Sequence, residues 1–363
     1  MRLFSVTRRT DADAKKCGWT HLLCTVSRFP LKAIFKDERF ISVWMFLHLL
    51  LLPLAAQSTY SEAYTFTTFA GCSRTASVDG AGSDAQFIEP SGVTVDTVGN
   101  VYVGDTFSFT IRKITPTGIV STIAGFAGIS GSADGTNEAA RFNQPIGVAI
   151  DTGGNLYVAD NGSSIIRKIA MVGTNSVVTT LAGLADNFGT NDGPGNAARF
   201  YQPFGIAVDN ASNVYVADSG NQTIRKLTSV GTVWMVSTIA GSAGNLGSAN
   251  GVGINASFNN PEGVAADNQG NVYVADTGNS TIRKLTPVGT NWMVSSIAGL
   301  AENPGDADGS NSVARFYQPA GVGMGNAGNI YVADTFNSTI RMLTQSGANW
   351  VVTTFAGNAE AVG

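Results

Sequence analysis

The chain alternates short apolar runs with small polar turns, and this pattern is clearest between Asn271 and Lys284. Val272 to Ala275 form an apolar run rich in residues that favour strands. Asp276 to Asn279 follow, with side chains that bond nearby backbone and a glycine that tolerates a positive φ. The apolar pattern resumes from Ile282 to Leu285. This stretch therefore predicts two strands joined by a tight turn.

The same stretch occurs five times along the chain. The repeated positions are Tyr102, Tyr157, Tyr215, Tyr273 and Tyr331 within the apolar run, and Asp105, Asp160, Asp218, Asp276 and Asp334 at its end. The spacing is 55 residues once and then 58 residues three times. A fixed period of this length is typical of a repeat architecture. We place the repeats near residues 82–125, 137–183, 195–241, 253–299 and 311–357.

One repeat contains four apolar runs, near residues 263–267, 271–275, 281–285 and 292–298, separated by hairpin-length turns. The second run is apolar on both faces, because Val272 and Val274 point one way and Tyr273 and Ala275 the other. A sheet that is apolar on both sides must be covered on both sides. The pattern therefore predicts an all-β propeller of four-stranded antiparallel blades, and a solenoid of stacked strands is the alternative.

The number of blades depends on how the two ends of the repeat region meet. Tyr64 to Gly71 match the last strand of a repeat, as in Val352 to Gly357. We expect five blades plus one extra outer strand, with an incomplete six-blade ring as the alternative.

The motifs Pro-x-Gly-Val-x-x-Asp, Gly-Asn-x-Tyr-Val-Ala-Asp and Ile-Arg-Lys resemble the NHL-repeat family of β-propellers over residues 82–357. Gly104, Gly325 and Met342 depart from the motifs at single positions. The resemblance also implies two activities known among such propellers, a lyase with histidine-bound zinc and RNA binding through a basic face.

Composition argues against both activities. The two histidines, His21 and His48, precede the repeats, so a zinc site of this kind is not expected. Residues 1–40 contain nine Lys and Arg against four Asp and Glu, whereas the rest contains thirteen against twenty-two. An acidic body is not attracted to phosphate backbones, so we expect no nucleic-acid partner. Cys72 is the one cysteine within residues 57–363, and we expect no metal or cofactor.

Residues 1–56 form a separate basic leader that ends in an apolar run, residues 41–56. Sixteen apolar residues are fewer than the roughly 20 of a membrane span, and small residues close the run. This pattern predicts a secretory signal peptide and an exported product, periplasmic, cell-surface or extracellular. The alternative is an uncleaved membrane anchor. Residues 57–363 then form the propeller.

Each repeat carries an Asp and an Arg at the same places, and we expect them to form structural ion pairs. A charge inside a covered strand needs a partner, and fivefold repetition indicates a stacking contact, not an asymmetric catalytic site. The pairs are Asp105 with Arg112, Asp160 with Arg167, Asp218 with Arg225, Asp276 with Arg283 and Asp334 with Arg341.

Phe107, Phe109 and Phe336 are the candidate ligand-binding residues. They fall in the turn after the Ala-Asp phrase, where the other repeats have Gly, Ser or Gln, and the turn lies on the loop-rich face. A plug over the closing seam is the competing role. We interpret the chain as an exported, non-enzymatic scaffold that binds a protein, peptide or glycan. A calcium-dependent lactonase- or lyase-like enzyme and an RNA-binding scaffold remain alternatives.

Overall fold

The computed structural model describes residues 67–72, 76–325 and 327–359. They belong to the second of two compact units, Glu62–Gly363. The predicted leader and its apolar run, residues 1–56, lie outside the described residues. Within the described part the chain is all-β, and its helical residues belong to 3-10 turns of three residues each.

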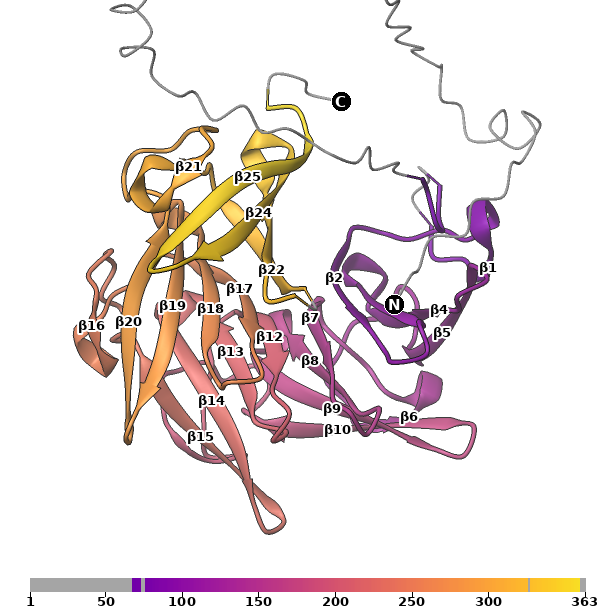
Figure 1. The fold of residues 1–363 in the computed structure, drawn as a ribbon. Coiled ribbons are helices and arrows are strands. Elements are labelled where there is room, and N and C mark those ends of the chain that lie inside the picture. The colour runs from indigo at the N-terminus through magenta and orange to yellow at the C-terminus, as the bar shows by residue number, and fades with distance from the viewer. Residues whose placement is uncertain (1–66, 73–75, 326, 360–363) are drawn as a thin grey trace, which may run out of the picture. The chain divides into compact units, whose positions relative to one another are not determined.

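Five antiparallel sheets of one topology make up the propeller, and each is one blade (Figure 1). Blade 1 contains β1 (Gly80–Ala81), β2 (Pro90–Val95), β3 (Val101–Asp105), β4 (Thr110–Ile114) and β5 (Ile119–Gly125). Blade 2 contains β6 (Gly135–Thr136), β7 (Pro145–Ile150), β8 (Leu156–Asp160), β9 (Ile165–Val172) and β10 (Asn175–Ala182). Blade 3 contains β11 (Gly193–Pro194), β12 (Pro203–Val208), β13 (Val214–Asp218), β14 (Thr223–Val230) and β15 (Val233–Ala240).

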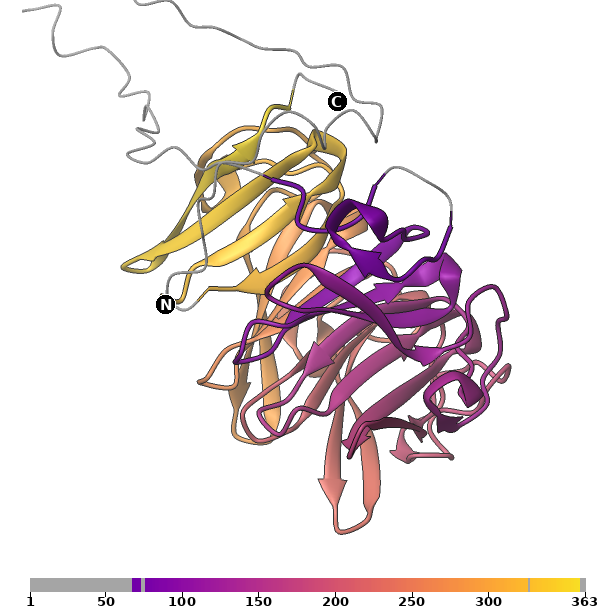
Figure 2. The same ribbon diagram turned by 90° about the vertical axis from the view of Figure 1, so that its right-hand side faces the viewer.

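The last two blades repeat the arrangement. Blade 4 contains β16 (Gly251–Val252), β17 (Pro261–Ala266), β18 (Val272–Asp276), β19 (Thr281–Val288) and β20 (Asn291–Ala298). Blade 5 contains β21 (Gly309–Ser310), β22 (Pro319–Met324), β23 (Ile330–Asp334), β24 (Thr339–Ser346) and β25 (Asn349–Gly357). In both views the colour passes from blade to blade in chain order (Figures 1 and 2).

Short 3-10 turns lie before the inner strand and between the second and third long strands of a blade. Those before the inner strand are η2 (Gly82–Asp84), η4 (Asn137–Ala139), η7 (Gly253–Asn255) and η9 (Asn311–Val313). Those between the long strands are η3 (Thr106–Ser108), η5 (Asn161–Ser163), η6 (Ser219–Asn221), η8 (Thr277–Asn279) and η10 (Thr335–Asn337).

The prediction of five blades is confirmed, but the prediction of four strands per blade is wrong. Each sheet has a fifth strand of two residues, which pairs with the outermost long strand. In blade 3 this strand places Gly193 opposite Val236 and Pro194 opposite Met235. The extra strand arises from the loop before the inner strand, which contains an Asp-Gly or Asn-Gly pair such as Asp192-Gly193 and has no alternating apolar pattern. We call it the Asp-Gly loop. Next to the extra strand, the carboxylate of Asp192 accepts hydrogen bonds from the backbone N–H and the hydroxyl of Thr238 in β15.

One end of every blade carries most of its loops. In blade 1, Pro90, Asp105, Thr110 and Gly125 lie opposite one another in register at this end. The turn η3 joins Asp105 to Thr110 here, and the loop toward the next blade leaves from Gly125. The corresponding ends of the five blades form what we call the loop-rich face.

Blades pack face to face, as the two-sided apolar pattern predicts. The inner strands β2, β7, β12, β17 and β22 lie beside one another in chain order. The core between blades 3 and 4 joins Tyr215 and Ile224 of one blade to Val264 and Val274 of the next. A glycine allows this approach, because a Cβ on Gly205 would lie 2.1 Å from the carbonyl oxygen of Glu262.

The outward faces of blades 1 and 5 are less covered than the faces between blades. In β2, Val93 is 62% exposed, whereas its counterpart Val148 in β7 is 5% exposed. At the other end, a Cβ on Gly321 would meet Ala333 of its own blade and no atom of another blade among the described residues. The described residues thus give blades 1 and 5 no mutual contact like the one between blades 3 and 4.

Candidate functional site

The repeated Asp and Arg lie next to the loop-rich face and form buried ion pairs in all five blades. In blade 3, Nη1 of Arg225 donates to Oδ2 of Asp218 at 2.6 Å, and both side chains are buried. The hairpin register produces this contact, because Asp218 ends β13 and Arg225 lies two residues into β14. The pairs of the other blades are Asp105 with Arg112, Asp160 with Arg167, Asp276 with Arg283 and Asp334 with Arg341.

Each of these arginines has a second polar partner that sequence analysis missed. Nη2 of Arg225 donates to Oδ1 of Asp192 at 2.7 Å, and its two NH2 groups also reach the carbonyl oxygens of Asn191 and Arg199. The ring of Phe200 lies 5.0 Å from the guanidinium. The equivalents of Asp192 are Asp79, Asp134, Asn250 and Asp308. Their constant spacing of 33 residues to the Arg was the available signal.

Each of the five buried carboxylates accepts hydrogen bonds from its arginine and from a backbone N–H. Asp218 accepts from the backbone of Tyr201 and from Asn221 as well as from Arg225. Burial raises the pKa of Asp218 to about 6, although Arg225 acts in the opposite direction. Burial likewise raises the pKa of Asp160 to about 7, against the effect of Arg167. The carboxylate of Asp218 therefore accepts three hydrogen bonds inside the blade, and these bonds stabilise the blade.

The three candidate phenylalanines lie on two blades and differ in exposure. Phe107 is 43% exposed and Phe336 is 60% exposed, whereas Phe109 is half-buried with φ of 61°. Phe336 packs on Tyr317 of its own blade with ring centroids 5.1 Å apart. Within the described part of the chain, the ring of Phe336 does not contact the ring of Phe107 or Phe109.

A further exposed aromatic pair on the loop-rich face was not singled out from the sequence. Phe188, in the loop after β10, stacks on Tyr201 with ring centroids 4.8 Å apart, and Phe188 is 65% exposed. Each repeat has a phenylalanine at one position, and the five are Phe87, Phe142, Phe200, Phe258 and Phe316. Tyr201 directly follows Phe200 in blade 3, and Tyr317 directly follows Phe316 in blade 5. Comparing the residue after each of these phenylalanines would have shown both tyrosines.

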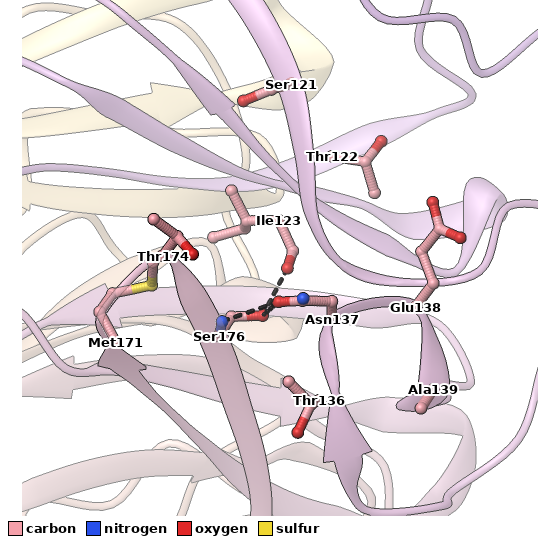
Figure 3. Close-up of a pocket in the computed structure, with 10 residues that line it drawn as sticks. All are labelled: Ser121, Thr122, Ile123, Thr136, Asn137, Glu138, Ala139, Met171, Thr174 and Ser176. Carbon is pink, nitrogen blue, oxygen red and sulfur yellow. Dashed lines mark hydrogen bonds between the residues drawn. The ribbon is translucent and has the colours of Figure 1, made fainter.

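A cavity of about 610 Å³ lies on the outer rim between blades 1 and 2, and we call it the Ser176 pocket (Figure 3). Ser176 lines it, and its hydroxyl donates to the carbonyl oxygen of Ile123 across the blade boundary. The backbone N–H of Ser176 donates to Oδ1 of Asn137 at 2.8 Å. The other lining residues are Ser121, Thr122, Thr136, Glu138, Ala139, Met171 and Thr174.

The described residues limit the other site classes. Among them, no three His, Cys, Asp or Glu side chains gather as a metal site would require. Nor does the described part of the chain contain a helix with the length and apolarity needed to cross a membrane.

Comparison with known sequences finds NHL repeats. A family model described as NHL repeat matches residues 142–169, 200–227 and 258–285. NHL repeat-containing protein 2 of Homo sapiens is 31% identical over 300 residues, which cover 73% of this chain and 40% of that protein. Protein SUPPRESSOR OF QUENCHING 1, chloroplastic, of Arabidopsis thaliana is 29% identical over 278 residues, which cover 73% and 26%. The chain spans less than half the length of either relative.

Comparison with solved structures finds the same fold at low identity. An auxiliary nutrient binding protein from Bacteroides thetaiotaomicron aligns with a TM-score of 0.50 and 16% identity, over 80% of this chain and 76% of that one. Streptogramin B lyase aligns with a TM-score of 0.48 and 15% identity, over 78% and 70%. The likeness to the auxiliary nutrient binding protein concerns the fold alone.

Proposed function

Because the chain belongs to the NHL-repeat β-propeller family, as its motifs indicated, we propose that it is a non-catalytic binding protein. Its loop-rich face holds a protein, peptide or glycan through exposed aromatic rings. Loops on a rigid β scaffold are the usual place for recognition. The repeated strands and ion pairs supply the scaffold, and the loops supply the variation between blades.

The two aromatic pairs on the loop-rich face carry this proposal. Phe188 with Tyr201 and Tyr317 with Phe336 are each in ring contact. Large exposed rings that are held in place bind a partner at a low entropic cost. Aromatic rings of this kind serve both peptide side chains and the apolar faces of sugars, so either class of partner fits.

Two observations favour binding over the enzyme and RNA alternatives. The repeated carboxylates that an enzyme could have used are buried and paired, as Asp218 is with Arg225. The five repeated arginines are fully buried as well, so they offer no basic surface to a phosphate backbone. We further propose that the protein is exported through its apolar leader, residues 41–56. N-terminal sequencing of secreted protein tests export, and a product that keeps Met1 in the cytoplasm contradicts it.

The binding proposal is tested with a displayed peptide library and a glycan array, followed by affinity measurement on the best binder. Phe336→Ala combined with Phe107→Ala, and separately Phe188→Ala, are expected to weaken binding about tenfold or more. Val288→Ala is the matched control, because Val288 is 57% exposed in the β19–β20 hairpin at the opposite end of a blade. Unchanged affinity in all the Phe variants, with normal folding, contradicts the proposal.

A further inference from the structure

Three neighbouring blade boundaries place a tryptophan indole on the outer rim in the same way. Trp234, Trp292 and Trp350 each present a ring to the tyrosine of the preceding blade, edge to face. The ring centroids are 6.0, 5.9 and 6.0 Å apart. The tyrosine partners are Tyr157, Tyr215 and Tyr273.

The boundary between blades 1 and 2 lacks this ring. One period of 58 residues before Trp234 stands Ser176, and the tyrosine that would receive the indole is Tyr102. Tyr102 is 8% exposed, whereas Tyr157 and Tyr215 are each 1% exposed. The missing indole therefore leaves the edge of Tyr102 more open than its counterparts.

The Ser176 pocket occupies the place of the missing ring. The equivalent cavity between blades 2 and 3, which Trp234 partly fills, measures about 360 Å³ against about 610 Å³ for the Ser176 pocket. The two are lined by matching segments of the repeat: residues 121–123 correspond to 179–181, and 136–139 include the positions equivalent to 194–196. We attribute the larger volume to the absence of the indole ring at Ser176.

At the boundary between blades 3 and 4 the indole also meets a lysine, and the equivalent lysine is present between blades 1 and 2. Nζ of Lys226 lies 5.7 Å from the ring of Tyr215 and 5.8 Å from the ring of Trp292, so the cation contacts both aromatic groups. Nζ of Lys113 lies 5.8 Å from the ring of Tyr102. Lys113 and Tyr102 thus make at this boundary the contact that Lys226 and Tyr215 make beside Trp292.

The rim of the pocket differs from the other boundaries in ways that suit a bound molecule. Met171 lines the pocket where blade 3 has Ser229, and a thioether contacts aromatic rings favourably. Glu138 and the hydroxyl groups of Thr136 and Thr174 line the polar side (Figure 3). These groups can accept the hydrogen bond of an indole N–H.

We propose that the Ser176 pocket binds an indole ring supplied by another molecule, as a free small aromatic compound or as a tryptophan side chain on a peptide. The ring takes the place that Trp234, Trp292 and Trp350 take at the other boundaries, where each indole meets the tyrosine of the preceding blade. This site is separate from the loop-rich face and does not depend on the function proposed for that face.

The test uses the full chain and two fluorinated probes observed by fluorine NMR. 5-Fluoroindole represents the free compound, and N-acetyl-5-fluorotryptophanamide represents the peptide-borne side chain. At least one probe is expected to bind saturably to one site. Tighter binding of the first indicates a free ligand, and tighter binding of the second indicates a peptide. Absence of saturable binding for both overturns the proposal.

Ser176→Trp is the decisive variant, because it supplies the indole from within the chain. It is expected to fold, because blade 5 already has a tryptophan at this position with the same backbone hydrogen bond. Oδ1 of Asn311 accepts from the backbone N–H of Trp350, as Oδ1 of Asn137 accepts from that of Ser176. Probe affinity is expected to fall at least about tenfold. Unchanged affinity overturns the proposal, and so does a misfolded variant, because an indole would then not fit this place.

Two further variants distinguish binding at this site from nonspecific binding of the probes. Met171→Ser introduces the residue of blade 3 and is expected to weaken probe binding several-fold while the fold is kept. Trp234→Ser opens the equivalent place between blades 2 and 3 and is expected to raise the number of bound probes from one to two. Unchanged binding in Met171→Ser together with one site in Trp234→Ser would contradict the assignment.

Discussion

Arg225 and Asp218 meet inside blade 3, where Nη1 of the arginine donates to Oδ2 of the aspartate at 2.6 Å. Neither side chain is exposed to solvent by more than 1%. The pair stands between the inner hairpin and the Asp-Gly loop, so it connects segments that are far apart in sequence. Its removal should therefore affect the folding of a whole blade.

Arg225→Met should destabilise the protein by about 3–5 kcal/mol, because it leaves the buried carboxylate of Asp218 without its cation. Urea unfolding at neutral pH measures the loss. Lys226→Met is the control, since this neighbouring lysine is half-buried and contributes a cation–π contact of about 1 kcal/mol. Equal effects of the two substitutions would contradict a special role for the buried pair.

The two acidic partners of Arg225 should differ in importance. Asp192 is about half exposed, with a side-chain exposure of 49%, and blade 4 has Asn250 in its place. Asp192→Asn should therefore cost less than about 1 kcal/mol. Asp218→Asn should cost about 3 kcal/mol, because its carboxylate is fully buried against the guanidinium. Urea unfolding of both variants under one condition decides, and the reverse order would be inconsistent with the structure.

The blades could be predicted from the sequence because local pattern and period agree. The alternation of Tyr273 and Val274 predicts a strand covered on both sides, and five copies in register predict its neighbours. The fifth strand could not be predicted in this way. Gly251 and Val252 have no alternating apolar pattern of their own. They pair with β20, where Oδ1 of the preceding Asn250 accepts from the backbone N–H of Ser296.

The candidate sites were only partly within reach of the sequence. The contact between Asp218 and Arg225 follows from a spacing of seven residues across a tight hairpin. The Ser176 pocket exists where the next repeat has a tryptophan ring. It is therefore recognised only when Ser176 is aligned with Trp234 and the cavity between the blades is known. Ring contacts such as Phe188 on Tyr201 depend on loop conformation, which the repeat pattern does not specify.

Alkaline pH should weaken the fold through the repeated tyrosines. Burial, together with the nearby carboxylate of Asp96, raises the pKa of Tyr102 from 10.0 to about 12. The hydroxyl of Tyr102 donates to Oδ2 of Asp96 at 3.2 Å, so the protonated form is the bound one. Between pH 10 and 12 the unfolded chain loses this proton while the native protein keeps it. The stabilisation is complete below pH 10 and is lost as pH rises through 12.

Tyr102→Phe should remove the contribution of this one titrating hydroxyl to the pH dependence of stability. Its free energy of unfolding should fall less steeply than that of the wild type between pH 10 and 12, by up to about 1.4 kcal/mol per pH unit. The difference between the two proteins at pH 8 measures the lost hydrogen bond alone, since tyrosine is protonated in both states there. Parallel pH profiles would show that Tyr102 does not titrate as expected.

Packing between blades should make two equivalent glycines behave differently. A Cβ on Gly205 would lie 2.1 Å from the carbonyl oxygen of Glu262 in the next blade, whereas a Cβ on Gly321 would meet Ala333 at 3.3 Å. Gly205→Ala must push two blades apart and should cost about 3 kcal/mol. Gly321→Ala should stay within about 0.5 kcal/mol, because no described residue of another blade covers that face. Thermal and urea unfolding of the two variants measure the difference. An equally large loss for Gly321→Ala would mean that another blade covers the outward face of blade 5 in solution. An added methyl group is strongly destabilising only where it clashes with the backbone of a neighbouring blade.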